Sequence, residues 1–139
     1  RPMYLEAMAS LPAAPVTLPL YKDGDEWVTD WAPLLSTLTD ITLPVGQRAG
    51  IFHASLARAL AEQAESVSRE SGTRRVALTG GVFQNRVLTE LVVAELDARG
   101  FQVCLDDQLP VNDGGLCAGQ VVEYAARHAS RPEEVAASA

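Results

Sequence analysis

The stretch R-V-A-L-T-G-G-V-F-Q-N-R, from Arg75 to Arg86, decides the fold of this chain. It predicts a short buried strand (Val76 to Leu78), a turn at Gly80 and Gly81, and then the opening of a helix. This order directs backbone N–H groups to the mouth of a helix, where the donors and the helix dipole together can hold an anion. Glycine at both turn positions would let a phosphate approach the backbone closely.

Helical and strand-like patterns alternate around this stretch. A long helical pattern from about Gln47 to Ser71 precedes it, a second from Asn85 to Arg99 follows, and Phe101 to Leu105 is another short apolar strand. Strands joined by helices predict a parallel pair with a right-handed crossover, and hence an α/β fold. The expected inward-facing residues are Phe52, Leu56, Leu60, Ala64 and Val67 on the long helix, and Val87, Leu88, Leu91, Val92 and Leu96 on the next.

The N-terminal third predicts a different arrangement. Met3 to Ser10 has helix-favouring composition, and two prolines between Leu11 and Pro15 end that helix. Val16 to Tyr21 and Glu26 to Asp30 predict the two strands of a hairpin around the polar turn Lys22 to Asp25, with Pro19 confining the first strand to an edge. Trp31 to Leu38 predicts a short helix.

The C-terminal part predicts a polar loop from Asp106 to Asp113, a helix from Gly114 to His128 and a frayed tail over 129–139. The whole chain, 1–139, is predicted to be a single domain. The loop at Asp113, Gly114 and Gly115 follows the carboxyl end of a strand, as Gly80 and Gly81 do. Ligands of parallel sheets gather outside these strand ends, so both loops are expected on one rim of one cleft.

Several of these positions have two readings from the residues alone. Gly80 and Gly81 either bind a phosphate or only permit a tight turn. They do not form a P-loop, because the sequence G-K-S or G-K-T does not follow them. Thr79 and Asn85 could add hydrogen bonds to a ligand, whereas Asn85 also suits a helix N-cap. The carboxylate of Asp113 could take a metal ion if other ligands come from elsewhere, or could cap a helix.

The histidines and cysteines suggest no local reactive group. His53 and His128 are too far apart for a local metal pair, and we expect His53 to be a packed or solvent-facing residue rather than a catalytic one. Cys104 and Cys117 do not form a zinc motif, and we expect ordinary thiols, although Cys117 lies near the predicted cleft. No Ser-His-Asp or Cys-His arrangement follows from the sequence.

Composition restricts the class of protein. The net charge of −7 argues against a DNA-binding or membrane-binding surface, and no apolar run reaches the ~18 residues of a membrane span. We therefore expect a cytoplasmic globular protein without a signal peptide. The chain begins at Arg1 rather than at methionine, which suggests a piece of a longer protein.

Taken together, the motifs resemble the C-terminal part of the HypF carbamoyltransferases, which act in nickel–iron hydrogenase maturation. The resemblance lies in L-T-G-G-V-F-Q-N-R-V-L (Leu78 to Leu88) and L-P-V-N-D-G-G-L-C-A-G-Q (Leu109 to Gln120). Weaker support comes from I-F-H-A-S-L-A (Ile51 to Ala57) and M-Y-L-E-A-M-A (Met3 to Ala9). The fold implied is the closing part of one lobe of an actin/hexokinase/Hsp-seventy-like structure.

The resemblance also implies an activity. In the family, ATP and carbamoyl phosphate give carbamoyl-adenylate, and the carbamoyl group passes to the C-terminal cysteine thiol of the partner HypE. By motif, Thr79, Gly80, Gly81, Asn85, Gly114 and Gly115 would bind nucleotide or substrate. Asp113 would be one ligand of a divalent metal, iron or zinc, whose other ligands lie outside this chain.

The chain lacks what the family carries upstream, including the metal-binding histidine pair. We therefore expect the isolated chain to be inactive, or to complete its site with another polypeptide, and to self-associate through apolar surface that its missing part would cover. Two alternatives stay open. One is an O-carbamoyl- or threonylcarbamoyltransferase lobe, and the other is a non-catalytic module that binds a nucleotide or a partner.

Overall fold

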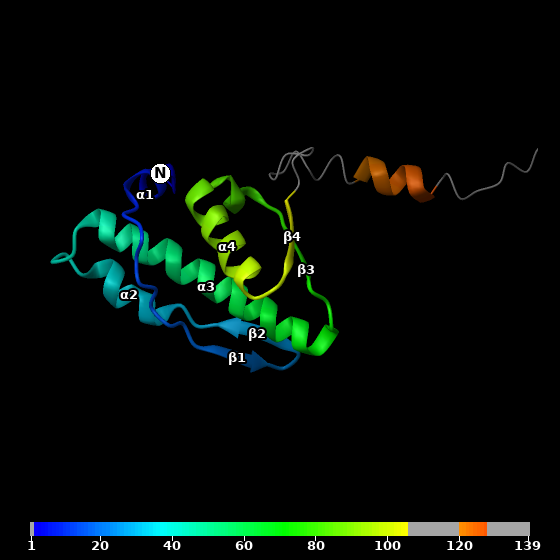
Figure 1. Ribbon diagram of the computed structural model, residues 1–139, viewed down its shortest axis with the longest axis horizontal. Helices are drawn as coiled ribbons and strands as arrows, with labels where there is room; N and C mark the ends of the chain where they lie inside the picture. Colours follow the sequence, from blue (N-terminus) through cyan, green and yellow to red (C-terminus); the bar gives the residue numbers. More distant parts are fainter. Residues whose placement is uncertain (1, 106–119, 128–139) are drawn as a thin grey trace, which may run out of the picture.

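The computed structural model describes residues 2–105 and 120–127 of the 139-residue chain (Figure 1). Its elements, in chain order, are α1 (Pro2–Met8), β1 (Leu20–Asp23), β2 (Glu26–Thr29), α2 (Ala32–Thr39), α3 (Val45–Ser71), β3 (Arg75–Leu78), the 3-10 helix η1 (Gly81–Gln84), α4 (Arg86–Ala98) and β4 (Gln102–Leu105). Residues 120–127 are also helical. None of the described helices is both long and apolar enough to cross a membrane.

Helix α3 runs through the middle of the structure between two groups of elements (Figure 1). The hairpin β1–β2 and helix α2 pack on one side, and α4 with strands β3 and β4 lies on the other. The helix ends where the sequence predicts, because Gly72 takes a left-handed conformation (φ 72°) and its N–H donates to the carbonyl of Ser68 at 2.8 Å.

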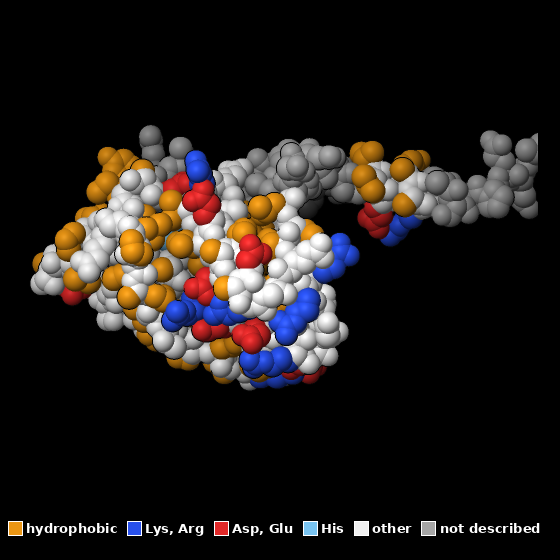
Figure 2. All heavy atoms as spheres, in the orientation of Figure 1, with side chains coloured by type: hydrophobic (Ala, Val, Ile, Leu, Met, Phe, Trp, Pro, Cys, Tyr) orange, Lys and Arg blue, Asp and Glu red, His pale blue; other side chains and the backbone are white. Residues whose placement is uncertain are grey.

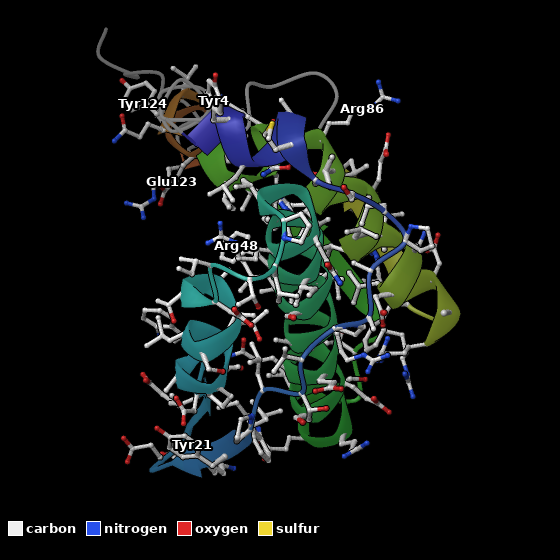
Figure 3. All side chains as sticks on the ribbon, turned by 90° about the vertical axis from the view of Figure 1, so that its left-hand side faces the viewer. Tyr4, Tyr21, Arg48, Arg86, Glu123 and Tyr124 are labelled. Carbon is white, nitrogen blue, oxygen red and sulfur yellow. The ribbon has the colours of Figure 1, made fainter. Side chains whose placement is uncertain are left out.

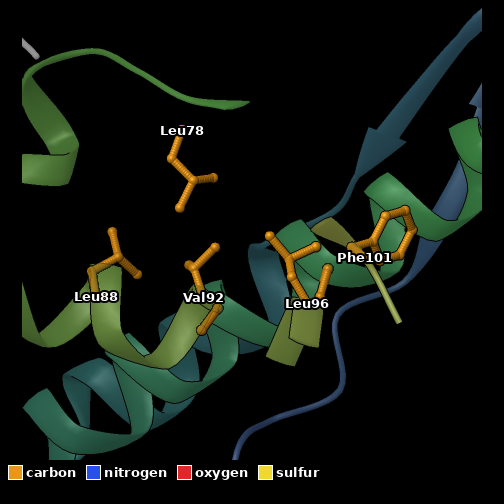
Figure 4. Close-up of a cluster of buried hydrophobic side chains, with 7 residues drawn as sticks. Leu78, Leu88, Val92, Leu96 and Phe101 are labelled. Carbon is orange, nitrogen blue, oxygen red and sulfur yellow. The ribbon is translucent and has the colours of Figure 1, made fainter. Parts of the chain in front are cut away.

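Strands β3 and β4 form a parallel pair, as predicted, with Arg75 opposite Gln102 and Leu78 opposite Leu105. Helix α4 connects them and supplies Leu88, Val92 and Leu96 to the main core. Figure 4 shows the side chain of Leu78 above Leu88 and Val92, with Phe101 at the far end of the row. Val87 and Leu91, also expected to face inward, are only half-buried.

The hairpin is antiparallel, as predicted, with a shorter turn than the sequence suggests. Its strands continue to Asp23 and Glu26, so the turn contains only Gly24, in a left-handed conformation (φ 60°), and Asp25. The first strand begins at Leu20 rather than at Val16, because residues 16–19 lie outside the ladder. The hairpin is fastened to α3 by Gln63, which donates to the Trp27 carbonyl at 2.6 Å, and by a 2.7 Å ion pair between Lys22 and Glu70.

The stripe expected on α3 is confirmed only in part: Phe52, Leu56 and Ala64 are half-buried and pack against the core clusters, but the other two residues do not. Leu60 and Val67 are 38% and 44% exposed, whereas the buried positions of this helix carry mostly alanine and serine. At the start of the helix, small residues are required by the close approach of the end of α1 and the segment after it: a Cβ on Gly46 would lie 2.8 Å from the Met8 carbonyl oxygen, and one on Gly50 2.1 Å from that of Ser10. Only small side chains fit under such a crossing.

Buried serine serves the same crossing segment. The hydroxyl of Ser55 accepts a hydrogen bond from the backbone N–H of Val16 at 2.9 Å and donates to the Ile51 carbonyl at 2.6 Å. A buried N–H of an extended segment needs such a partner. Ser55 therefore satisfies a backbone group of the segment that crosses α3.

Candidate functional site

The turn after β3 differs from the predicted one. Gly80 has φ +98°, and η1 then makes one 3-10 turn before α4 begins at Arg86. Gly80 therefore precedes η1 and Gly81 is its first residue, so neither glycine stands directly at the mouth of α4, as the sequence suggests. At least one N–H group of η1 bonds within the turn and is not available to a ligand: the N–H of Phe83 donates to the Gly80 carbonyl at 3.1 Å.

Asn85 stands between η1 and α4, at the N-cap of α4. Its Oδ1 accepts a hydrogen bond from the backbone N–H of Leu88 at 2.9 Å, which is the N-cap geometry considered from the sequence. Its Nδ2 lies 2.8 Å from Nε2 of His53 on α3. One half-buried carboxamide thus connects the start of α4 to the middle of α3.

His53 is fully buried, as one of the two readings allows, but it also contacts a predicted site residue. Its Nδ1 lies 2.7 Å from the carbonyl oxygen of Ala49, and the Phe52 ring packs against it edge-on at 5.4 Å. A carbonyl can only accept, so Nδ1 carries the hydrogen. The Leu88 N–H can only donate, so the amide group of Asn85 faces the ring and Nε2 accepts. These contacts fit a neutral imidazole.

The first N–H of α4 already has an anionic partner. Oε1 of Glu6, on α1, accepts from the Arg86 backbone N–H at 2.7 Å. A carboxylate suits this place, because the N-terminus of a helix carries partial positive charge. The Arg86 side chain projects away from the head of α4 (Figure 3) and its Nε donates to Glu90 at 2.6 Å, a contact that raises the pKa of the guanidinium.

These elements line an open pocket of about 830 Å³. Its walls come from α1, α3, η1 and the start of α4, and its lining residues are Leu5, Glu6, Phe52, His53, Leu56, Gly81, Val82, Gln84, Asn85 and Leu88. Most of them are apolar, with a few polar groups at fixed places, which is typical of a small-molecule site. The volume is also in the range that such sites have.

Two of the predicted site residues line this pocket, namely Gly81 and Asn85. Thr79 and Gly80 are exposed and are not among its lining residues. Asp113, Gly114 and Gly115 lie outside the described residues, as do Cys117 and His128, and so the common rim of the two loops stays a prediction.

The sequence interpretation missed Glu6 and Phe52 and did not assign a role to His53. Glu6 lies 80 positions from Arg86, and His53 lies 32 from Asn85, so no local pattern links either pair. The available signal was that both residues occur in the two weaker segments of the resemblance, M-Y-L-E-A-M-A and I-F-H-A-S-L-A.

The described residues do not fit a metal ion. Residues 2–105 and 120–127 hold no group of three His, Cys, Asp or Glu side chains arranged for one. Both ring nitrogens of His53 are engaged by protein groups, so this histidine cannot serve as a ligand without losing them. A nucleotide fits the pocket better, because its apolar walls can pack against a base and amide groups can donate hydrogen bonds to oxygen atoms of the nucleotide.

Known proteins with similar sequences point to one family. A family model described as "Carbamoyltransferase, Kae1-like Domain, second subdomain" matches residues 1–120. The carbamoyltransferase HypF of Rhizobium leguminosarum bv. viciae is 39% identical over 101 residues, 72% of this chain and 13% of that protein. HypF of Synechocystis sp. is 33% identical over 94 residues, 67% of this chain and 12% of that protein.

Solved structures agree. Full-length HypF in its phosphate- and nucleotide-bound form superposes with a TM-score of 0.82 at 26% identity, over 94% of this chain and 17% of that one. HypF of T.kodakarensis gives a TM-score of 0.71 at 26% identity, over 92% of this chain and 17% of that one. The chain thus spans a small part of the length of these relatives, and its mixed helices and strands match theirs.

Proposed function

Because this chain belongs to the HypF carbamoyltransferase family, we propose that it supplies one wall of a nucleotide-dependent carbamoyltransferase site. The relatives that it matches are much longer, so the complete activity would need parts that they carry elsewhere. In this proposal the 139-residue chain binds nucleotide and does not transfer a carbamoyl group by itself.

One observation carries the proposal. The family-like stretch G-G-V-F-Q-N contributes Gly81, Val82, Gln84 and Asn85 to a single pocket with apolar walls. The similar HypF structure is described as phosphate- and nucleotide-bound, which supports a nucleotide as the ligand class. Phe52 and Leu88 would cover the base or sugar, and Asn85 would meet an oxygen of the nucleotide.

The proposed reaction is the one that the resemblance implies. ATP, carbamoyl phosphate and one water give carbamoyl-adenylate with release of phosphate and pyrophosphate, and a cysteine thiolate of a HypE-like acceptor then attacks the carbamoyl carbon. A sulfur–carbon bond forms, the bond from that carbon to the phosphate oxygen breaks, and AMP leaves with the electron pair. The described residues would hold the adenylate and exclude water from it, which favours transfer to the thiol over hydrolysis.

Further parts of the prediction belong to this proposal. Asp113 would be one ligand of a divalent metal, with the others from outside the chain, and Gly114 and Gly115 would lie beside it. The chain would form part of the second lobe of an actin/hexokinase/Hsp-seventy-like fold and would work in the cytoplasm.

Calorimetry with ATP tests the proposal directly. Val82→Trp would fill the pocket and raise the dissociation constant by about tenfold or more. Val67→Trp is the matched control, because Val67 is also an exposed valine but does not line the pocket. Absence of ATP binding by the chain, or equal loss in both variants, would contradict the proposed site.

A further inference from the structure

We propose that His53 is a positioning residue that holds the Asn85 carboxamide with its amide group toward the ligand. The inference rests on the proposed function, because it concerns the ligand of the same pocket. Its direct evidence is the 2.8 Å contact between Nε2 of His53 and Nδ2 of Asn85. Both residues line the pocket, and His53 is fully buried.

Each contact of this pair determines the next. The Ala49 carbonyl fixes the hydrogen of His53 on Nδ1, which leaves a lone pair on Nε2 for Asn85. The Leu88 N–H fixes Oδ1 of Asn85 on the other side. A flipped carboxamide would place its oxygen against the lone pair of Nε2 and its NH₂ against the Leu88 N–H, so both hydrogen bonds would be replaced by repulsive contacts.

This arrangement has a consequence for ligand choice. The carbonyl oxygen of Asn85 is committed to the helix cap, and one amide hydrogen is committed to His53. In this proposal, Asn85 offers the ligand its second amide hydrogen, which takes part in neither contact, while its oxygen is turned toward the N–H of Leu88 at the helix cap. The site therefore selects an acceptor, such as a hydroxyl, phosphate or ring acceptor atom of the nucleotide, and disfavours an N–H group at that place.

Two substitutions separate the two halves of the imidazole. In His53→Gln, the side-chain oxygen reaches the place of Nε2 and can still accept from Asn85. In His53→Asn, the shorter amide can still donate to the Ala49 carbonyl, as Nδ1 does, but cannot reach Asn85. Both variants replace the ring by a carboxamide, so each serves as the other's control for loss of packing against Phe52.

The affinity of the 139-residue chain for ATP, measured by calorimetry, is the first readout. His53→Asn should raise the dissociation constant about tenfold, the effect of one misplaced hydrogen bond, while His53→Gln stays within about threefold of the wild type. Equal losses in the two variants, or wild-type affinity in His53→Asn, would overturn the inference and leave the proposed function intact. A wild-type chain that binds no ATP would overturn both.

The second readout needs neither variant nor ligand. Nitrogen-15 NMR of the wild-type imidazole should show the hydrogen on Nδ1 and an unprotonated Nε2 near neutral pH. A hydrogen on Nε2 would overturn the inference even if His53→Asn fails to fold.

Discussion

Gly80 and Gly81 adjoin in sequence but differ in what their backbone requires. Gly80 has φ +98°, a conformation that side chains with a Cβ rarely adopt, although open space surrounds it. Gly81 has no such φ, and a Cβ there would also meet nothing within 4 Å. The turn itself therefore needs the first glycine, and only a ligand that approaches the backbone would need the second.

Alanine substitutions should separate these two needs. Gly80→Ala should lower the free energy of unfolding by about 1–3 kcal/mol, because it forces a strained backbone. Gly81→Ala should change it by less than about 0.5 kcal/mol and yet weaken ATP binding. Urea denaturation and calorimetry on both variants check this prediction. Unchanged ATP affinity in Gly81→Ala would show that no ligand approaches this backbone.

At the same scale, the ion pair between Lys22 and Glu70 should make the docking of the hairpin sensitive to acid. The hydrogen bond from Lys22 holds the pKa of Glu70 below its ordinary value of 4.5 in the folded chain. A lowered folded pKa means that the contribution to stability is full above about 4.5 and is lost as the pH falls through the folded value. The pair is exposed, so we expect a small effect.

Urea denaturation of the wild type and of Glu70→Gln between pH 7 and pH 3 tests this prediction. The wild type should be the more stable of the two at neutral pH, and the difference should shrink below about pH 4.5. The stability difference between the wild type and Lys22→Gln should shrink over the same pH range. The double variant should be about as stable as either single variant, because each substitution alone already removes the ion pair. A difference that stays constant with pH would show that the ion pair is not its source.

At the scale of the element, α3 was predicted correctly in extent but only in part in its buried face. The helical period and Gly72 determine where it lies in the sequence, and both can be read locally. Its buried face cannot, because hydrophobicity favours Leu60 and Val67 while the packing of the crossing segment requires Gly46 and Gly50. Size, rather than hydrophobicity, decides which residues lie under a close crossing.

Because of this close crossing, we expect Gly50→Ala to lower the free energy of unfolding, although helix propensity alone would raise it. Alanine is favoured over glycine in a helix by about 1 kcal/mol, so Gly50→Ala would normally stabilise the chain. Here the new methyl would lie 2.1 Å from the Ser10 carbonyl oxygen, so we expect a loss of about 1–3 kcal/mol instead. Thermal and urea denaturation would measure it.

Ala94→Gly provides the matched control for this helix effect. Ala94 is exposed on α4, so this reverse change should cost only the ordinary propensity difference of about 1 kcal/mol. A stabilised Gly50→Ala variant would mean that the segment after α1 does not cross α3 as closely as described.

At the scale of the whole molecule, the pocket joins three parts of the chain that lie far apart in sequence. The turn after β3 and the carboxamide of Asn85 could be predicted, because strand, glycine pair and helix follow one another locally. The contributions of Glu6 and His53 could not, since they depend on where α1 and α3 cross the head of α4. Asp113 and its glycines stay a prediction.

The molecule also exposes large apolar side chains beside α2. Figure 2 shows hydrophobic side chains at the end of the molecule where α2 meets the start of α3. Ile41, between the two helices, and Val45, the first residue of α3, are 89% and 49% exposed, and Trp31, at the other end of α2, is 59% exposed. Such a surface favours association. This supports the prediction that the chain self-associates.

Ile41→Asp should reduce that self-association. The side chain is almost fully exposed, so its replacement removes few contacts within the chain and should leave the thermal midpoint nearly unchanged. Light scattering over a concentration series should show a larger average mass for the wild type than for the variant. A wild type that stays monomeric at high concentration would contradict the prediction.

The hydrogen bond between Glu6 and the Arg86 backbone has a practical consequence for work with this chain. Removal of the first seven residues would leave the packing of α4 against β3 and β4 in place but would take away one wall of the pocket. If a preparation has lost its N-terminal residues to proteolysis, weaker ligand binding would then result from the loss of this wall of the pocket and not from damage to the core. Mass spectrometry of the sample therefore belongs beside every binding measurement.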